Sequence, residues 1–369
     1  MEELLIERAS CGELEEIYGA MQRSFPQEEL RDFADLSRVF VMPEYGVYHI
    51  VFGGERVGFT GIWQLEGFAF IEHFAISSAS RGHGLGSLAI KELQRKFGRI
   101  VLEIEPPVDE ITTRRFNFYS RLGFVMNDVP YLQPPYRAED EPLPLRLMSY
   151  PAALTSPVPV IEQIYKVVYG RSGGLTSFLK VRKLAEGDDL AAVAHLIYKT
   201  DDYVFPFMFK GREKDAVPVF TAMIGRNTLY NAANITVAEL AGKIVGIVVS
   251  LPAPITVSPS EMMDCFLLSG QVVDENFTQV YNEYYKPLEN EPSGIYIANV
   301  CVDGAYRGMG IARLMLSQIL RDDKTYNLET VKGNEAAFRL YSGLGFKVLN
   351  EYPGFTNVPC YRMRREKKE

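Results

Sequence analysis

A short glycine-containing stretch occurs twice in this chain, each time directly after an apolar run. The two copies are Arg81-Gly82-His83-Gly84-Leu85-Gly86-Ser87, which follows residues 68–76, and Arg307-Gly308-Met309-Gly310-Ile311-Ala312-Arg313, which follows residues 295–302. Each predicts a strand, a tight turn and a helix. Small residues at the fourth and sixth positions let the backbone approach a ligand, and the free N–H groups of the new helix point toward it. Such a turn binds anions, and a pyrophosphate fits it.

A single turn of this kind often only ends a strand or begins a helix. Two copies with matching flanks favour a shared binding role. Neither copy has the GxxxxGK[ST] spacing of a nucleotide phosphate loop or the GxGxxG spacing of a dinucleotide fold, so both of those sites fit worse.

The length and charge of the chain limit the classes of protein to which it can belong. Its 369 residues suggest about two domains, and 47% hydrophobic with 23% charged residues are ordinary globular values. The formal net charge of -8 argues against a nucleic-acid partner and suits a small or cationic substrate.

The cysteines and the N-terminus give no sign of secretion. Cys11, Cys265, Cys301 and Cys360 lie far apart without a CxxC pair, which favours neither a disulfide framework nor a thiolate metal site. The N-terminus lacks a signal-peptide pattern, and no apolar run approaches the roughly 20 residues of a membrane span. We therefore expect a cytoplasmic protein with no metal site and no membrane partner.

The predicted elements follow the same order in both halves of the chain. In the first half we expect strands at 4–8, 46–52, 56–64, 68–76, 100–104 and from 124, with helices at 10–23, at 27–40, after Gly84 and up to about 122. In the second half we expect strands at 179–183, 235–240, 244–250, 295–302, 327–330 and from 346, with helices at 188–198, after Gly310 and at 334–344. This order predicts an α/β (α+β) fold in two tandem domains.

The segment between the two halves is rich in proline and ends in Gly173-Gly174. We expect an N-terminal domain at 1–150, a helix and linker at 151–174, and a C-terminal domain at 175–369. The second domain carries an insertion at about 252–293, and aromatic residues of this insertion have helical spacing. That spacing favours packing in a core or against a partner over a wall for a substrate.

Both halves resemble GNAT-superfamily N-acetyltransferases, over about residues 4–149 and 179–364. The family's acetyl-CoA turn, Arg/Gln-x-x-Gly-x-Gly/Ala, is present as Arg81-x-x-Gly84-x-Gly86 and as Arg307-x-x-Gly310-x-Ala312. Its later motif, Tyr-x-x-x-Gly-Phe, is present from Tyr119 to Phe124 and from Tyr341 to Phe346. The resemblance implies a mixed, mostly antiparallel twisted sheet flanked by helices in each half, with acetyl-CoA as co-substrate.

The resemblance also implies which residues contact acetyl-CoA. In the first half they are Phe74, Ala75, Ile76, Arg81, Gly82, Gly84, Leu85, Gly86 and Ser87; in the second they are Val300, Cys301, Val302, Arg307, Gly308, Gly310, Ile311, Ala312 and Asn334. The strand residues act through a backbone N–H that polarises the thioester carbonyl. Asn334 stands seven residues before Tyr341, where the family has a cofactor-contacting Asn, whereas the first half has Thr112 at that spacing.

Acetyl transfer to an amine needs a neutral nucleophile, a stabilised oxyanion and a proton for the departing thiolate. Tyr119 and Tyr341 stand where the family places its thiolate-protonating tyrosine, although buried core tyrosines have the same helical spacing. Glu72 lies two residues before Phe74 and on the same strand face, so it either acts as a base, directly or through a water, or is a solvent-facing or salt-bridged Glu. The motif arginines lie 226 positions apart (307 − 81), which places Ala298 opposite Glu72. The second copy thus lacks this carboxylate.

The sequence therefore predicts an acetyl-CoA-dependent N-acetyltransferase that moves an acetyl group to a primary amine of a small molecule or peptide, by direct attack in a ternary complex. Two alternatives stay open: one domain is catalytic and the other structural or CoA-sensing, or the whole chain is a non-catalytic CoA-binding protein. The acceptor and any oligomer are left open too. Aromatic candidates to line the acceptor pocket are Tyr131, Tyr136, Tyr203, Phe205, Phe207 and Phe209.

Overall fold

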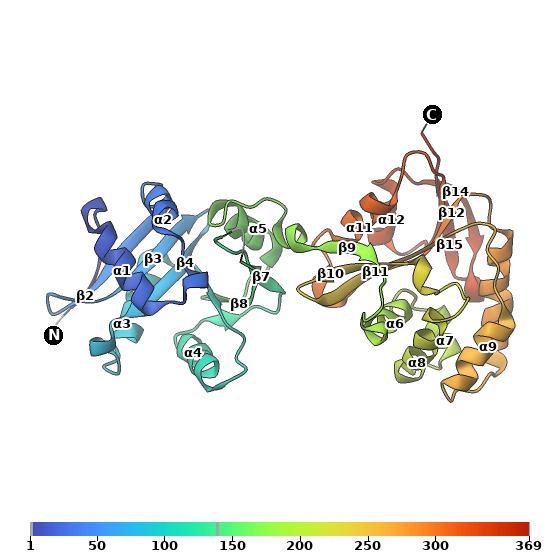
Figure 1. Cartoon of the computed structure of the whole chain (residues 1–369), viewed down its shortest axis with the longest axis horizontal. Coiled ribbons are helices and arrows are strands. Elements are labelled where there is room, and N and C mark those ends of the chain that lie inside the picture. The colour runs from blue at the N-terminus through green and yellow to red at the C-terminus, as the bar shows by residue number, and fades with distance from the viewer. Residues whose placement is uncertain (1–2, 138–139, 369) are drawn as a thin grey trace. The chain divides into compact units, whose positions relative to one another are not determined.

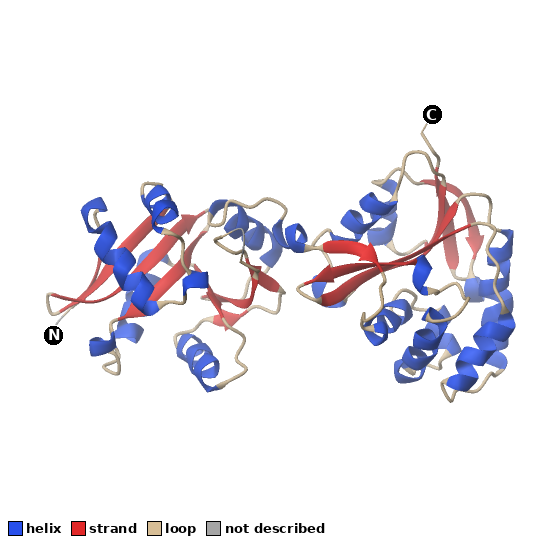
Figure 2. Ribbon diagram, viewed as in Figure 1, coloured by secondary structure: helices blue, strands red, loops and turns tan. Residues whose placement is uncertain are grey.

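The computed structural model describes residues 3–137 and 140–368, and the chain divides into two compact units, Met1–Ser177 and Phe178–Glu369 (Figure 1). Each unit is one main mixed sheet with helices packed against it, which confirms the predicted fold class (Figure 2).

The sheet of the first unit has the strand order β1-β2-β3-β4-β5-β8-β6, with β7 paired to β8. Its strands are β1 (Leu4–Arg8), β2 (Tyr45–Phe52), β3 (Glu55–Leu65), β4 (Phe68–Ile76), β5 (Ile100–Ile104), β6 (Val125–Met126), β7 (Tyr131–Gln133) and β8 (Leu143–Tyr150). The pair β4–β5 is parallel and the other neighbours are antiparallel.

The helices of the first unit are α1 (Leu14–Ser24), α2 (Phe33–Phe40), α3 (Leu85–Phe97), α4 (Glu110–Arg121) and α5 (Pro157–Val167), with short 3-10 turns η1 (Cys11–Glu13), η2 (Gln27–Glu29) and η3 (Ser78–Ser80). The predicted helix over 27–40 is interrupted, because Leu30 is extended and Asp32 caps α2 by accepting a hydrogen bond from the Asp35 N–H at 2.7 Å.

The sheet of the second unit has the order β14-β15-β13-β12-β11-β10-β9, in which only the pair β12–β13 is parallel. Its strands are β9 (Lys180–Lys183), β10 (Ile235–Leu240), β11 (Lys243–Pro252), β12 (Ile295–Val302), β13 (Tyr326–Val331), β14 (Lys347–Pro353) and β15 (Pro359–Arg365).

The helices of the second unit are α6 (Leu190–Tyr198), α7 (Val204–Met208), α8 (Glu213–Ile224), α9 (Pro259–Leu268), α10 (Glu275–Val280), α11 (Ile311–Ile319) and α12 (Glu335–Ser342). Its short turns are η5 (Ala232–Asn234), the π-helical η6 (Tyr281–Tyr285), η7 (Lys286–Asn290), η8 (Gly304–Tyr306) and η9 (Phe355–Asn357), and η4 (Gly174–Phe178) spans the boundary between the two units.

The predicted insertion forms α9, α10, η6 and η7, and it packs into the core of the second unit. Phe277, Val280 and Tyr285 are buried there, so the helical spacing of its aromatic residues reflects core packing. Phe205 and Phe209 are buried in the same core, which leaves neither ring free to line a pocket.

The parallel strand pair in the middle of each sheet separates after three residues. In the first unit the pairs are Ala69↔Ile100, Phe70↔Val101 and Ile71↔Leu102, and in the second unit they end at Ile297↔Leu328. A register shift on the opposite edge of the strand coincides with each separation: His73 pairs with Gly61 but Ile71 with Ile62, and Asn299 pairs with Val249 but Ile297 with Ser250. Glu72 and Ala298 are therefore the extra residues of equivalent β-bulges, and a bulge bends its strand.

Candidate active site

The bulges leave one edge of β4 and one edge of β12 unpaired. Within the described strands, β4 continues to Ile76 although its pairing with β5 stops at Ile71, and β12 continues to Val302 although its pairing with β13 stops at Ile297. The predicted carbonyl-polarising segments, 74–76 and 300–302, lie on these unpaired stretches. No described strand covers that edge, so it is open to an extended ligand, although the Ile76 and Val302 carbonyls accept hydrogen bonds from the motif arginines.

Both glycine turns have the same backbone conformation. Gly84 is the N-cap of α3 with φ 77° and ψ -1°, and Gly310 is the N-cap of α11 with φ 79° and ψ 3°, both left-handed. A Cβ atom at either position would meet nothing within 4 Å. The φ angle thus requires glycine, while the space beside the turn stays open for a ligand.

The motif arginines tie each turn to the end of its strand. Arg81 Nε donates to the Ile76 carbonyl at 3.0 Å, and Arg307 Nε donates to the Val302 carbonyl at 3.1 Å. A cavity of about 280 Å³ between α1 and the ends of β3 and β4 is lined in part by Ala75, Ile76 and Arg81, but neither Glu72 nor Glu103 lines it. The first turn therefore has open space beside it.

Tyr119 and Tyr341 occupy matching places on α4 and α12. Each is 8% exposed, and burial raises the pKa of each hydroxyl to about 12. Their rings contact Phe124 and Phe346, with centroid distances of 5.5 and 6.0 Å, so the Gly-Phe of the motif holds the tyrosine in place. Both hydroxyls keep their protons at neutral pH.

The residues that precede these tyrosines differ between the units. Asn334 is the N-cap of α12, where its side-chain oxygen accepts from the Ala337 N–H at 3.1 Å. Thr112 lies within the first turn of α4 and is engaged in a capping box with Asp109. Both side chains therefore have capping roles.

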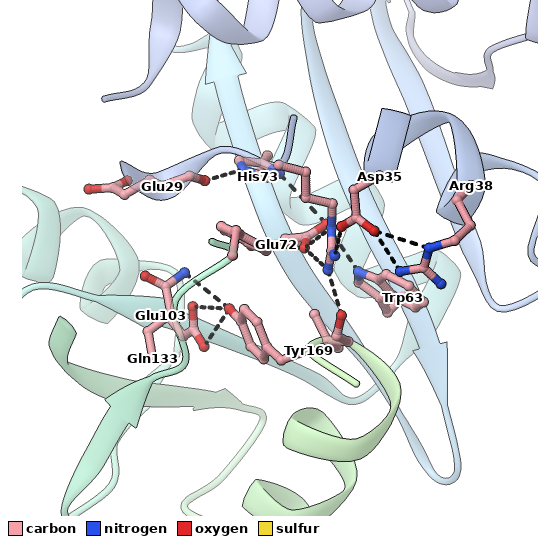
Figure 3. A network of polar contacts seen from close by, with 12 residues as sticks. Glu29, Asp35, Arg38, Trp63, Glu72, His73, Glu103, Gln133 and Tyr169 are labelled. Atoms are coloured by element: carbon pink, nitrogen blue, oxygen red, sulfur yellow. Dashed lines mark hydrogen bonds and ion pairs between the residues drawn. The ribbon is translucent and has the colours of Figure 1, made fainter. Parts of the chain in front are cut away.

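The Glu72 carboxylate is buried and saturated with donors (Figure 3). Its side chain is 1% exposed. Oε1 accepts from Arg31 Nε at 3.2 Å, Arg31 Nη2 at 2.9 Å and the Tyr136 hydroxyl at 2.8 Å, and Oε2 accepts from Trp63 Nε1 at 3.0 Å. Burial raises the pKa of Glu72, but the Arg31 charge and the other donors outweigh it, so the pKa lies below its ordinary value. Of the two interpretations of Glu72, the salt-bridged one describes this geometry.

Arg31 is itself enclosed, with 5% of its side chain exposed. It donates to Asp35 at 2.7 Å and to the Val168 carbonyl at 2.5 Å. Its guanidinium carbon lies 4.6 Å from the centroid of the Tyr136 ring and 5.5 Å from that of Trp63. These contacts fix the ion pair in one geometry.

A second carboxylate, Glu103, follows the last parallel pair on β5. Its neighbours Leu102 and Ile104 belong to the core under α3 and α4, so Glu103 points to the opposite face of the sheet. The Tyr131 hydroxyl donates to Oε1, and the Tyr169 hydroxyl lies 3.2 and 3.1 Å from the two carboxylate oxygens. Burial raises the pKa of Glu103 to about 8 against the opposing effect of these hydroxyls.

Sequence reasoning did not single out Glu103, although the repeat contains a signal for it. The offset of 226 positions that relates the motif arginines also relates Glu103 to Glu329. Both are the first residues after the last parallel pair, on β5 and on β13. The two units thus place a glutamate at the same point of the strand opening.

The residue facing this glutamate differs between the units. Leu147 is the antiparallel partner of Glu103, whereas Arg362 is the partner of Glu329. Arg362 Nη2 donates to Glu329 at 2.7 Å and to Glu291 at 2.9 Å. Glu291 comes from the insertion, its side chain is 1% exposed, and burial raises its pKa to about 6. Among the residues that the structure describes, Glu329 therefore has an ion-pair partner and Glu103 has none.

Within residues 3–137 and 140–368, no cluster of three His, Cys, Asp or Glu side chains is arranged to bind a metal ion. In the same residues, no helix is both long and apolar enough to cross a bilayer.

Comparison with known proteins matches both units to the same protein family. The model of the acetyltransferase (GNAT) family matches residues 13–124 and 200–346. YjbC of Bacillus subtilis, which is named as an acetyltransferase, is 31% identical over 110 residues, which are 29% of this chain and 55% of that protein. The chain thus matches about half the length of this relative.

Two solved structures are similar to part of the chain. An acetyltransferase of the GNAT family from Bacteroides thetaiotaomicron is 28% identical, with a TM-score of 0.44, and the match covers 46% of this chain and 99% of that one. An N-acetyltransferase from Staphylococcus aureus Mu50 is 19% identical, with a TM-score of 0.41, and the match covers 50% of this chain and 99% of that one.

The buried ion pair predicts a large loss of stability for one arginine variant and a small loss for its neighbour. Arg31→Gln leaves the Glu72 charge buried without its partner and should destabilise the first unit by about 3 to 5 kcal/mol. Arg38 also pairs with Asp35, but the Arg38 side chain is 66% exposed. Arg38→Gln should therefore lower the free energy of unfolding by less than about 1 kcal/mol. Urea unfolding followed by the fluorescence of Trp63, the single tryptophan, reports on this unit.

The stabilisation that the Glu72–Arg31 ion pair gives to the first unit depends on pH in one direction. Because the folded-state pKa of Glu72 lies below its unfolded value, the stabilisation is present above the unfolded pKa and is lost as the pH falls toward the folded pKa. Equal and small losses of unfolding free energy for Arg31→Gln and Arg38→Gln would contradict the assignment of Glu72 and Arg31 as a buried ion pair.

Proposed function

Because the chain belongs to the GNAT acetyltransferase family and contains two tandem copies of its domain, we propose that it transfers an acetyl group from acetyl-CoA to a primary amine. The acceptor is a small molecule or a peptide, and the amine attacks the thioester directly in a ternary complex. The observation that carries the proposal is the repeated arrangement of a bulged strand with a free edge, followed by a left-handed glycine turn at the start of a helix.

The cofactor side is built from backbone groups in both units. The first turns of α3 and α11 present N–H groups to the pyrophosphate, and the open space beside Gly84 and Gly310 lets the backbone approach it. In the predicted contact set, Leu85, Gly86 and Ser87 continue this surface in the first unit, and Ile311, Ala312 and Asn334 do so in the second. The strand segments 74–76 and 300–302 polarise the thioester carbonyl through a backbone N–H.

On the acceptor side of the first unit, Glu103 is the base of this proposal. An alkylamine has a pKa near 10, so it must lose a proton before it attacks. Glu103 is half-buried and its pKa of about 8 lies near the operating pH, as efficient proton transfer requires. Glu72, which accepts four hydrogen bonds, is a weaker base and instead positions Arg31 and Tyr136.

Tyr119 supplies the proton to the departing thiolate in this proposal. It packs in the core under α3 and α4, whereas Glu103 faces the other side of the sheet. The proton acceptor for the amine and the proton donor for the thiolate therefore lie on the two sides of the opening between β4 and β5. This arrangement separates the two proton transfers of the reaction.

The second unit keeps the proposed cofactor side, but its glutamate equivalent to Glu103 is ion-paired. Ala298 replaces Glu72, and Arg362 pairs with Glu329. We infer that this unit binds acetyl-CoA and acetylates slowly, or only amines of low pKa. This observation favours the alternative in which one domain is catalytic and the other mainly binds or senses CoA.

Two CoA molecules should bind each chain. Gly84→Val or Gly310→Val forces a β-branched residue to a positive φ and blocks backbone approach, so each variant should bind one CoA. Gly54→Val is the matched control, because Gly54 has φ 83° and open space in the hairpin turn between β2 and β3, outside the glycine motif. Titration calorimetry measures the stoichiometry, and one CoA per unmodified chain would refute the two-site version.

Tyr119→Phe should lower kcat of the first unit by about 10²-fold, the low end of lost general acid catalysis. Its affinity for CoA should change little, because the ring and its packing stay in place. Thiol release from acetyl-CoA gives the rate. Activity that persists within about twofold would make Tyr119 a core residue and assign the proton to another donor.

The glycine variants also isolate each unit within the intact chain. With Gly310→Val only the first unit turns over, and we expect fast acetylation of ordinary alkylamines. With Gly84→Val we expect acetylation at least about 10²-fold slower, improving for amines of low pKa. A panel of amines of graded pKa provides the measurement. Fast acetylation of high-pKa amines by the Gly84→Val chain, with an inert Gly310→Val chain, would reverse the assignment.

A further inference from the structure

The segment that follows the first sheet packs onto the first unit, although it lies outside the residues matched by the family model. Ile161, Ile164 and Tyr165 of α5 are buried, and the Tyr165 hydroxyl donates to the Leu132 carbonyl of β7. The segment is therefore anchored beside the strand that carries Tyr131. It is part of the folded first unit rather than a free tether.

The end of this segment contributes two groups to the polar network around Glu72 and Glu103 (Figure 3). The Val168 carbonyl accepts from Arg31 Nη2 at 2.5 Å. The Tyr169 hydroxyl donates to the Glu103 carboxylate, 3.1 Å from Oε2, and accepts from Gln133 Nε2 at 3.0 Å. Consecutive residues of the segment thus contact both carboxylate clusters.

Tyr169 also connects the two clusters through its ring. The ring lies 5.3 Å from that of Tyr136, centroid to centroid, and the Tyr136 hydroxyl donates to Glu72. A tyrosine in this position fixes the Glu103 carboxylate relative to the rigid pair of Glu72 and Arg31. At this position β5 pairs with β8 but not with β4, because its parallel pairing stops at Leu102, so strand pairing does not tie Glu103 to the strand that carries Glu72.

We propose that the segment between the two domains completes the acceptor side of the first active site, with Tyr169 as the residue that positions the Glu103 carboxylate. The inference rests on the proposed function in one respect, namely that Glu103 accepts the proton of the amine. Tyr169 touches no reacting atom and acts through Glu103.

Several ionisable groups face Glu103, and they act on its pKa in opposite directions. They are Glu29 in η2, Glu72 on β4, Tyr131 on β7, Tyr136 in the following loop, Tyr165 on α5 and Tyr169. Burial and the negative charges of Glu72 and Glu29 favour the protonated carboxyl, whereas the hydroxyls of Tyr131 and Tyr169 stabilise the carboxylate by donating to it. Loss of one of these two hydroxyls must therefore raise the pKa of Glu103.

The test is a direct titration of the Glu103 carboxyl in the full chain, without any substrate. Carbon-13 NMR of labelled glutamate carboxyls follows the titration, and Glu103→Gln assigns the signal. The unmodified chain should titrate with a midpoint near 8. Tyr169→Phe should move the midpoint upward by about one pH unit, the size expected for one hydrogen bond to a charged group.

Two further variants serve as a second test and as a control. Tyr131→Phe removes the other donor and should move the midpoint in the same direction. Tyr48→Phe is the matched control, because Tyr48 is a buried tyrosine of β2 that packs with Phe97 in the core on the opposite face, and it should leave the midpoint unchanged. An unchanged midpoint in Tyr169→Phe, with the Trp63 emission of the folded chain, overturns the inference.

Activity then separates this inference from the proposed function. In an active chain, Tyr169→Phe should move the rise of kcat/KM with pH upward by the same amount and retain the plateau at high pH. A uniform loss at every pH indicates packing alone and counts against the inference. Absence of thiol release by the unmodified chain with every amine refutes the proposed function, whereas the titration of Glu103 still decides the role of Tyr169.

Discussion

The β-bulge at Glu72, repeated at Ala298, is the constraint on which the site in each unit depends. One extra residue on β4 shifts its register against β3 and coincides with the end of its parallel pairing with β5. The strand then runs on with a free edge to the glycine turn, where the left-handed Gly84 starts α3. Bulge, free edge and turn follow one another within 13 residues, from Glu72 to Gly84, so the proposed cofactor surface is largely a local property of the chain.

The chemistry on the other side of the sheet is not local, and here the two units differ. The same strand opening displays Glu103 in one unit and Glu329 in the other, but the register partner is Leu147 in the first and Arg362 in the second. Burial raises the pKa of Glu103, which lies opposite an apolar residue, whereas Glu329 accepts a hydrogen bond from Arg362 at 2.7 Å and is ion-paired. The two glutamates therefore have equivalent backbone positions but different side-chain partners.

This division between local and distant contacts explains what the sequence could predict. Strand 68–76, both glycine turns and the tyrosine helices were predicted correctly, because alternation, helical spacing and the need for a positive φ all act within a few residues. The hydrogen-bond and ion-pair partners of Glu72 were not predictable in this way. Its partner Arg31 lies 41 positions before it and Tyr136 lies 64 positions after it, and no periodicity relates them. Glu103 was missed for the same reason, since Tyr131 and Tyr169 create its environment, although the repeat offset to Glu329 identifies the position.

The most direct measurement is the pH dependence of kcat/KM for an alkylamine acetylated by the full chain and by Glu103→Gln. The account predicts that kcat/KM of the unmodified chain decreases as the pH is lowered through an apparent pKa near 8. This decrease is separate from the titration of the amine itself near pH 10. Glu103→Gln should lose about 10² to 10⁴ in rate and, with it, the dependence near pH 8. A Glu103→Gln chain that keeps both the rate and that dependence would contradict the account.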